Sequence, residues 1–157
     1  MAGKAIGLTR RALLMAASAG GAGLASAALL PAPVASEEAN ETMELVKQIV
    51  GHVPTVSDRV HLKMPASFPT GYTVPLEIEI DSPMTSADHV RLVRVFAPRN
   101  PITEVVTFSF TAGRSEARAS TRVRLAAPQF VVAVAEMNDG TFLMNKTWVE
   151  VATNGCA

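Results

Sequence analysis

Apolar residues recur at every second position over most of residues 72–151, and this period constrains the fold more than any other feature. Over residues 74–80, for example, valine, leucine and isoleucine alternate with proline and glutamate. The side chains of a strand point alternately to its two faces, so this pattern predicts a half-buried strand. Further strands are expected at 90–96, 106–110, 117–125, 130–137 and 141–151.

Turn signals separate these strands at regular spacing. Asn138-Asp139-Gly140 is typical of a hairpin between the last two strands. Pro75 inside its strand indicates an edge position, because proline has no N–H for a ladder. A change of period near Leu92-Val93 indicates a β-bulge. Together these features predict an all-β fold, an immunoglobulin-like antiparallel β-sandwich.

One short helix is expected before the strands, over residues 36–50. Ser36 or Asn40 is the expected cap, and Gly51 is a natural stop. Helical spacing puts apolar residues on one face. That face consists of Met43, Val46, Ile49 and Val50.

The N-terminal 35 residues are typical of an export signal. Arg10 and Arg11 precede a weakly apolar, Ala/Gly-rich stretch at 12–30. Paired arginines in this context favour the twin-arginine route, and a general secretory signal is the alternative. Cleavage is expected after Ala35, with Ala27 as a second candidate. We therefore expect a periplasmic protein with no membrane anchor after cleavage.

Removing this signal takes away three basic and no acidic residues, so the formal charge falls from 0 to −3. A mildly acidic chain without a basic stripe is a poor nucleic-acid binder. The expected organisation is a signal peptide at 1–35, a helical segment at 36–53, a β-sandwich at 54–151 and a C-terminal arm at 152–157.

Cys156 is the only cysteine in the chain, so it cannot form an internal disulfide. It lies five positions beyond Val151, a reach of about 16–18 Å when extended. Gly155, just before it, is the residue least restricted in backbone conformation. The segment from Val149 to the end contains no lysine, arginine or histidine that would activate the thiol. This placement favours a thiol that is processed in a partner's site.

A thiolate can hold added sulfur covalently as a disulfide or persulfide. Cys156 is therefore the candidate site of covalent sulfur attachment, and Gly155 the candidate source of freedom in the arm. The alternative is an incidental cysteine on a noncatalytic binding or assembly module of a redox complex. A stand-alone thiol oxidoreductase is the weakest hypothesis, because the chain has no second cysteine.

Four segments carry a family resemblance, and they are residues 81–90, 95–101, 119–126 and 134–140. Together they resemble the SoxY family, the sulfur-carrier subunits of the thiosulfate-oxidising Sox system. The twin-arginine-like leader is also similar to that family. SoxY proteins carry sulfur on a Gly-Gly-Cys-Gly-Gly arm, of which Gly155 and Cys156 match. Asn154 stands in place of the first glycine.

The resemblance implies a carrier that is acted on by enzymes and is not itself an enzyme. It implies a SoxZ-like sandwich partner, attachment of thiosulfate by the haem protein SoxAX and sulfonate hydrolysis by SoxB. It also implies oxidation of the remaining sulfur by SoxCD where that enzyme is present. The carrier itself needs no cofactor, and its cargo is the sulfur held on Cys156.

The remaining polar groups suggest no catalytic residue. His52, His61 and His89 lack close metal-ligand spacing, so no metal site is expected. Arginines on one face of the 117–125 strand are expected either to steer anions or contact an acidic partner, or to form an ordinary solvated face. They are Arg118, Arg122 and Arg124. The dispersed methionines favour packing over soft-metal binding.

Overall fold

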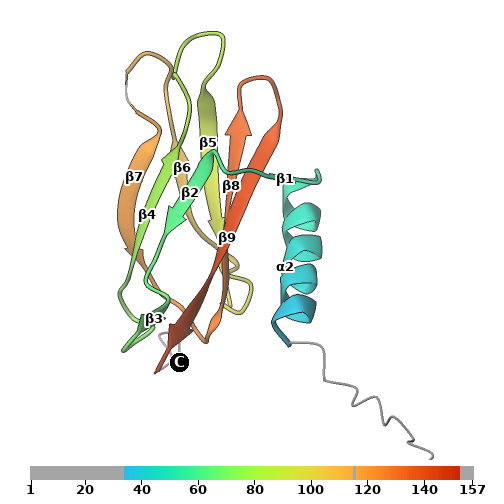
Figure 1. Cartoon of the computed structure of the whole chain (residues 1–157), viewed down its shortest axis with the longest axis vertical. Coiled ribbons are helices and arrows are strands. Elements are labelled where there is room, and N and C mark those ends of the chain that lie inside the picture. The colour runs from blue at the N-terminus through green and yellow to red at the C-terminus, as the bar shows by residue number, and fades with distance from the viewer. Residues whose placement is uncertain (1–33, 115, 153–157) are drawn as a thin grey trace, which may run out of the picture. The chain divides into compact units, whose positions relative to one another are not determined.

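The structure, a computed structural model, describes residues 34–114 and 116–152. Two β-sheets pack against each other in these residues, with one helix beside the larger sheet (Figure 1). The larger sheet has the order β1-β9-β8-β5-β6, with β3 also paired to β9, and the smaller has the order β2-β4-β7. The strands are β1 (Thr55–Val56), β2 (Val60–Lys63), β3 (Ser67–Phe68), β4 (Val74–Ile80), β5 (Val90–Phe96), β6 (Glu104–Ser109), β7 (Arg118–Val123), β8 (Gln129–Met137) and β9 (Phe142–Val151).

The predicted sandwich is confirmed, and every strand expected from the alternation is present. The long strands pair antiparallel; β1 and β3, two residues each, pair parallel to β9. Neither short strand, nor β2, was predicted. Their sequences are too short and too broken by proline for the alternation to show.

The main core lies between the sheets and is built from small and branched side chains. On β4 the burial alternates perfectly, with Val74, Leu76, Ile78 and Ile80 at 3% exposure or less. Val131, Ala133 and Ala135 face them from β8 and are fully buried. The alternating pattern therefore corresponds directly to the inner faces of the two sheets.

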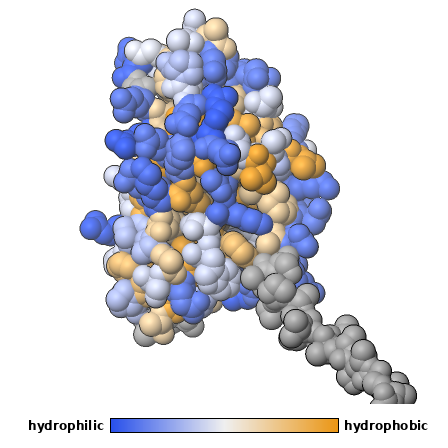
Figure 2. Space-filling model, viewed as in Figure 1, coloured by the Kyte–Doolittle hydropathy of each residue, from blue (hydrophilic) through white to orange (hydrophobic). Residues whose placement is uncertain are grey.

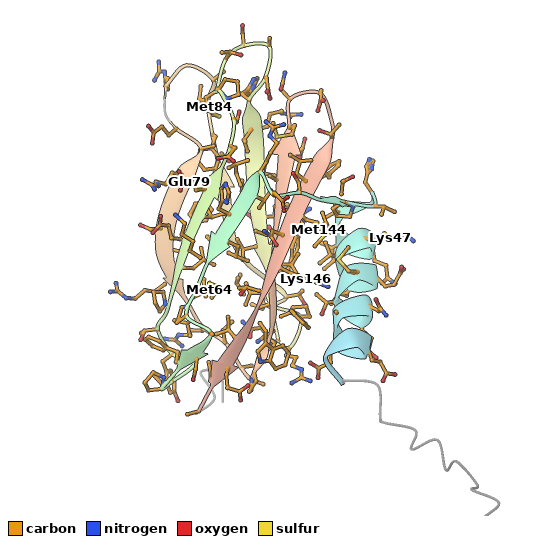
Figure 3. All side chains as sticks on the ribbon, viewed as in Figure 1. Lys47, Met64, Glu79, Met84, Met144 and Lys146 are labelled. Atoms are coloured by element: carbon orange, nitrogen blue, oxygen red, sulfur yellow. The ribbon has the colours of Figure 1, made fainter. Side chains whose placement is uncertain are left out.

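A second apolar cluster lies on the outer face of the larger sheet. Helix α2 (Val34–Val50) contributes the fully buried Val46 to it. The cluster's other buried members, all from the larger sheet, are Phe96, Val132, Val134 and Met144. Figure 3 shows Met144 on the side of β9 that faces α2. This cluster explains why β8 is apolar on both faces, as a central strand under a helix must be.

The helix differs from the prediction at its start. It begins at Val34, so Ser36 and Asn40 lie inside the helix and not at its N-cap position. Its end agrees with the prediction: Gly51 has a φ of 79°, and its N–H donates to the carbonyl of Lys47 at 2.8 Å. No described helix, within 34–114 and 116–152, has the length and hydrophobicity to cross a membrane.

The prediction that Pro75 lies on an edge strand is wrong, although Pro75 itself has a paired strand on one side only. Strand β4 is central, between β2 and β7. However, β2 pairs only with residues 77–80 of β4, while Pro75 pairs with Arg122 of β7 alone. Pro75 therefore lies beyond the end of β2, where a missing N–H leaves no carbonyl without its donor.

The predicted bulge and hairpin are both present. The β5–β8 register shifts between Val90 and Leu92, next to the predicted position. The hairpin turns at Gly140, whose φ of 84° suits glycine. Asn138 also connects this turn to the loop between β4 and β5. Its side chain accepts a hydrogen bond from the His89 N–H and donates one to the Ala87 carbonyl, both at 3.0 Å.

Candidate functional site

Cys156, the predicted site of sulfur attachment, and Gly155, the predicted source of freedom in the arm, lie outside the described residues. What the structure gives is the point from which they continue. The β9 strand ends at Val151, which pairs with Phe68 of β3. The N–H of Ala152 then donates to the Phe68 carbonyl at 3.2 Å. Cys156 is four residues further along the chain.

This exit point belongs to the end of the sandwich at which β7 also finishes. The β7 and β9 arrows in Figure 1 point in the same direction, toward β3. A hydrogen bond confirms the proximity: the N–H of Leu125, just after β7, donates to the Gly71 carbonyl at 2.8 Å. Gly71 is three residues after Phe68. The short segment 68–71 therefore accepts hydrogen bonds from the residues that follow both β9 and β7.

The three arginines singled out on the β7 face differ in their surroundings. Arg118 is ion-paired, with its Nη2 3.1 Å from a carboxylate oxygen of Glu79 and 3.6 Å from one of Glu77. By contrast, the guanidinium groups of Arg122 and Arg124 are exposed and have no hydrogen-bond or ion-pair partner among the described residues. Within the part of the chain that the structure describes, Arg118 is therefore ion-paired, and Arg122 and Arg124, called the free arginines below, are not.

Arg118 belongs to an ion-pair network on the exposed face of the smaller sheet. Lys63 Nζ lies 3.1 Å from Glu79 and 3.3 Å from Glu77. The hydrogen bonds from Lys63 and Arg118 lower the pKa of Glu79, and the hydrogen bond to Glu79 raises the pKa of Lys63. Figure 2 shows hydrophilic side chains over much of this face.

A polar network fixes the backbone beside the free arginines. Asn100 donates through Nδ2 to the Arg124 carbonyl at 2.7 Å and accepts at Oδ1 from the Ala126 N–H at 2.8 Å. Gln129, only 2% exposed, donates to the same Oδ1 at 3.1 Å and accepts from the Arg99 N–H at 2.8 Å. The segment that presents Arg124 is therefore held by side-chain hydrogen bonds as well as by the sheet.

Two open cavities flank the end of β7, and Arg122 lines both. One, of about 740 Å³, lies on the outer face of the smaller sheet and includes Lys63 and Met64. The other, of about 520 Å³, lies where the free edges of β6 and β7 meet, and is lined by Arg124 and Ile102. Ile102 is 76% exposed. This end of the molecule thus combines free positive charge with open space.

The one carboxylate that lines the second cavity, that of Glu104, is already paired with an arginine. Glu104 accepts from Nε of Arg94 at 3.1 Å and from Nη2 at 2.5 Å, and Thr107 donates to its other oxygen. The hydrogen bond from Arg94 is the main cause of the lowered pKa of Glu104. Glu104 is therefore ion-paired with Arg94 and makes no ion pair with either of the two free arginines.

The three histidines lie apart. His52 packs edge-on against the Phe142 ring at 4.9 Å, and His61 lies 2.9 Å from an Asp81 oxygen. Nδ1 of His89 is buried and lacks a partner within the described part of the chain. Across residues 34–114 and 116–152, no three His, Cys, Asp or Glu side chains come together as metal ligands.

The comparison with protein families decides the assignment. Residues 28–156 match the family model described as sulfur oxidation protein SoxY, and the match includes Cys156. The chain belongs to the SoxY family. The predicted family is thereby confirmed, and with it the expectation that this SoxY protein is a carrier in sulfur oxidation and not a catalyst.

Solved structures agree with this SoxY fold. The sulfur carrier protein SoxY from Chlorobium limicola f thiosulfatophilum has a TM-score of 0.57 at 20% identity, covering 74% of this chain and 98% of that chain. A superoxide reductase (neelaredoxin) from Ignicoccus hospitalis has a TM-score of 0.54 at 13% identity, and the match covers 62% of this chain and 94% of the reductase chain. At these identities the likeness concerns the fold alone. No curated protein matches the chain.

Sequence reasoning missed the network that joins Asn100 to Gln129. The Asn100-Pro101 pair indicates only a turn, and an isolated glutamine before an apolar strand carries no signal of burial. One hint was available: a polar residue directly before a strand as apolar as β8 needs a partner if it is buried. Which partner it finds depends on chain segments 29 residues apart.

Proposed function

We propose that this SoxY protein holds thiosulfate-derived intermediates covalently on Cys156 and presents them to partner enzymes. The family match, which includes Cys156, is the observation that carries the proposal. The fold supports it. A sandwich whose last strand continues directly into the cysteine-bearing segment can present a thiol to a partner while its own core stays intact.

The proposed loading step is an oxidation. The thiol and thiosulfate combine to give Cys–S–S–SO₃⁻, releasing one proton and two electrons, and a haem protein of the SoxAX type accepts the electrons. Water then attacks the outer sulfur in a SoxB-type enzyme, releasing sulfate and a proton and leaving Cys–S–SH. A SoxCD-type enzyme oxidises the remaining sulfur where it is present. The carrier supplies only the thiol and needs no cofactor of its own.

The partner and compartment belong to the same proposal. A SoxZ-like sandwich is the expected permanent partner, and the periplasm is the expected location, reached by the twin-arginine route. The arginine pair at 10–11 supports that route, and residues 1–33 lie outside the described part of the chain.

Mass spectrometry of the intact protein purified from thiosulfate-grown cells tests the proposal. We expect adducts on Cys156 of the masses of thiosulfonate and added sulfane sulfur. Protein that carries only glutathione, or no adduct, in cells that actively oxidise thiosulfate would contradict it.

A Cys156→Ser variant separates a carrier from an assembly module. The carrier function predicts loss of thiosulfate oxidation with unchanged partner binding, because the hydroxyl differs from the thiol by one atom and cannot hold sulfur. Unchanged oxidation would show that the chain acts through assembly alone. The exposed Ser109→Ala variant is the matched control and is expected to behave as wild type.

A further inference from the structure

We propose that Arg122 and Arg124 form a docking site for the sulfonate group of the loaded arm, residues 153–157 of this same chain. The inference rests on the proposed function, since it needs a sulfonate on Cys156. It adds to that function a resting position for one specific intermediate.

The first argument is reach. From Ala152, the four steps to Cys156 span about 13–14 Å when extended. The arm starts where Ala152 bonds to Phe68, and the three steps from Phe68 to Gly71 span at most about 10–11 Å. Gly71 in turn accepts the hydrogen bond from Leu125, the neighbour of Arg124. The arm is therefore longer than the segment that separates its exit from the end of β7.

The second argument is charge. Five other described arginines, Arg59, Arg91, Arg94, Arg99 and Arg118, have a carboxylate partner. Arg122 and Arg124 have none within the part of the chain that the structure describes, and they alternate along one face. Two such guanidinium groups, on residues two positions apart, match an anion with several oxygens, because each presents a planar fork of donors.

The third argument is space without competing negative charge. The cavities of about 740 and 520 Å³ lie on either side of Arg122. Each contains one carboxylate, and each of these is held by a cation of its own: Glu77 by Lys63 and Glu104 by Arg94. A sulfonate that enters here meets the two free arginines without having to displace an existing ion pair.

The backbone is also prepared for such a site. Asn100 holds the Arg124 carbonyl and the Ala126 N–H, at 2.7 and 2.8 Å. A binding group on a held backbone loses less conformational freedom when its ligand arrives. Because both binding groups are cations, the docked state should favour the sulfonate-bearing intermediate over arms without that group.

Nuclear magnetic resonance on the full chain tests the proposal with two chemically defined adducts. Tetrathionate converts the Cys156 thiolate to Cys–S–S–SO₃⁻ and releases thiosulfate. Methyl methanethiosulfonate converts it to Cys–S–S–CH₃ and releases methanesulfinate. Both adducts contain the same disulfide and differ in the sulfonate. Intact mass confirms each before measurement.

The Nε–H signals of Arg122 and Arg124 and the amide signals of residues 121–125 are the readout. We expect them to shift in the sulfonate adduct and not in the methyl adduct, and the shifts to shrink as salt is raised. The double variant R122Q/R124Q should lose the shifts at unchanged adduct mass. Equal shifts from both adducts, or none from either, would overturn the docking site.

R114Q provides the matched control. Arg114 is also exposed and without an ion pair in the described residues, but it follows Gly113, whose N–H donates to Met84. Figure 3 places Met84 at the end of the sandwich opposite Met64, which lines the larger cavity. R114Q should keep the shifts; their loss would also overturn the site.

These outcomes are separate from a failure of the proposed function. Both adducts are made with reagents, so the docking test does not depend on partner enzymes or on growth with thiosulfate. Absence of adducts in thiosulfate-oxidising cells would remove the carrier role whatever the spectra show.

Discussion

Nε2 of Gln129 donates a 3.1 Å hydrogen bond to Oδ1 of Asn100, and this pair joins the start of β8 to the loop before β6. The same Nε2 donates to the Ala127 carbonyl at 3.1 Å, and Oε1 accepts from the Arg99 N–H. One buried amide thus satisfies three groups at the end of the sandwich where β9 ends.

Replacing Gln129 by methionine should destabilise the fold by about 1–3 kcal/mol, because the Arg99 N–H and the Ala127 carbonyl lose their partner while staying partly buried. Chemical denaturation measures the change. Gln48→Met on the exposed face of α2 is the control, with an expected effect within about 0.5 kcal/mol. Equal effects at the two positions would show that the network contributes nothing.

Truncating Met144 to alanine should cost about 2–5 kcal/mol, because Met144 is fully buried between β9 and α2 and its removal leaves a cavity. Met144→Leu keeps most of the volume and should cost less than about 1.5 kcal/mol. Thermal or urea unfolding compares the two. A small loss for the alanine variant would mean that α2 contributes little to the stability of the sandwich.

Gly140→Ala should destabilise the hairpin by about 1–2 kcal/mol. The cause is backbone conformation, since φ is 84° and an added Cβ would meet no atom within 4 Å. Gly140→Asn should cost less, because asparagine enters this region more easily. If alanine and asparagine cost the same, the strain argument is wrong.

Stability should fall with acid partly through Glu104. Its pKa is lowered in the folded state by the Arg94 hydrogen bond, from an ordinary value of 4.5. Its contribution is therefore fully present above pH 4.5 and is lost as pH falls below that value through the folded pKa. Unfolding free energies of wild type and Glu104→Gln, measured from pH 7 to pH 3, should converge. A constant difference would contradict this origin.

Much of the fold follows from local pattern. The alternation of Val74 to Ile80 and the Asn138-Asp139-Gly140 turn each depend on residues adjacent in sequence, so both could be predicted. The start of α2 could not, because extension of the helix to Val34 removes the capping role from both Ser36 and Asn40. Competing local signals of similar strength leave such boundaries open.

The amino-acid sequence was enough to predict the sandwich and the family, and it makes Cys156 the candidate thiol for sulfur attachment. These depend on side-chain period and on the types of residue present, which need no long-range information. The folded structure was needed to find that Arg118 is ion-paired, while Arg122 and Arg124 have no partner among residues 34–114 and 116–152. The folded structure also shows that the residues just after β7 and β9 bond to the same short segment, at Gly71 and Phe68. Both depend on contacts between segments far apart in the chain, and hydrogen-bond partners are chosen by proximity in space.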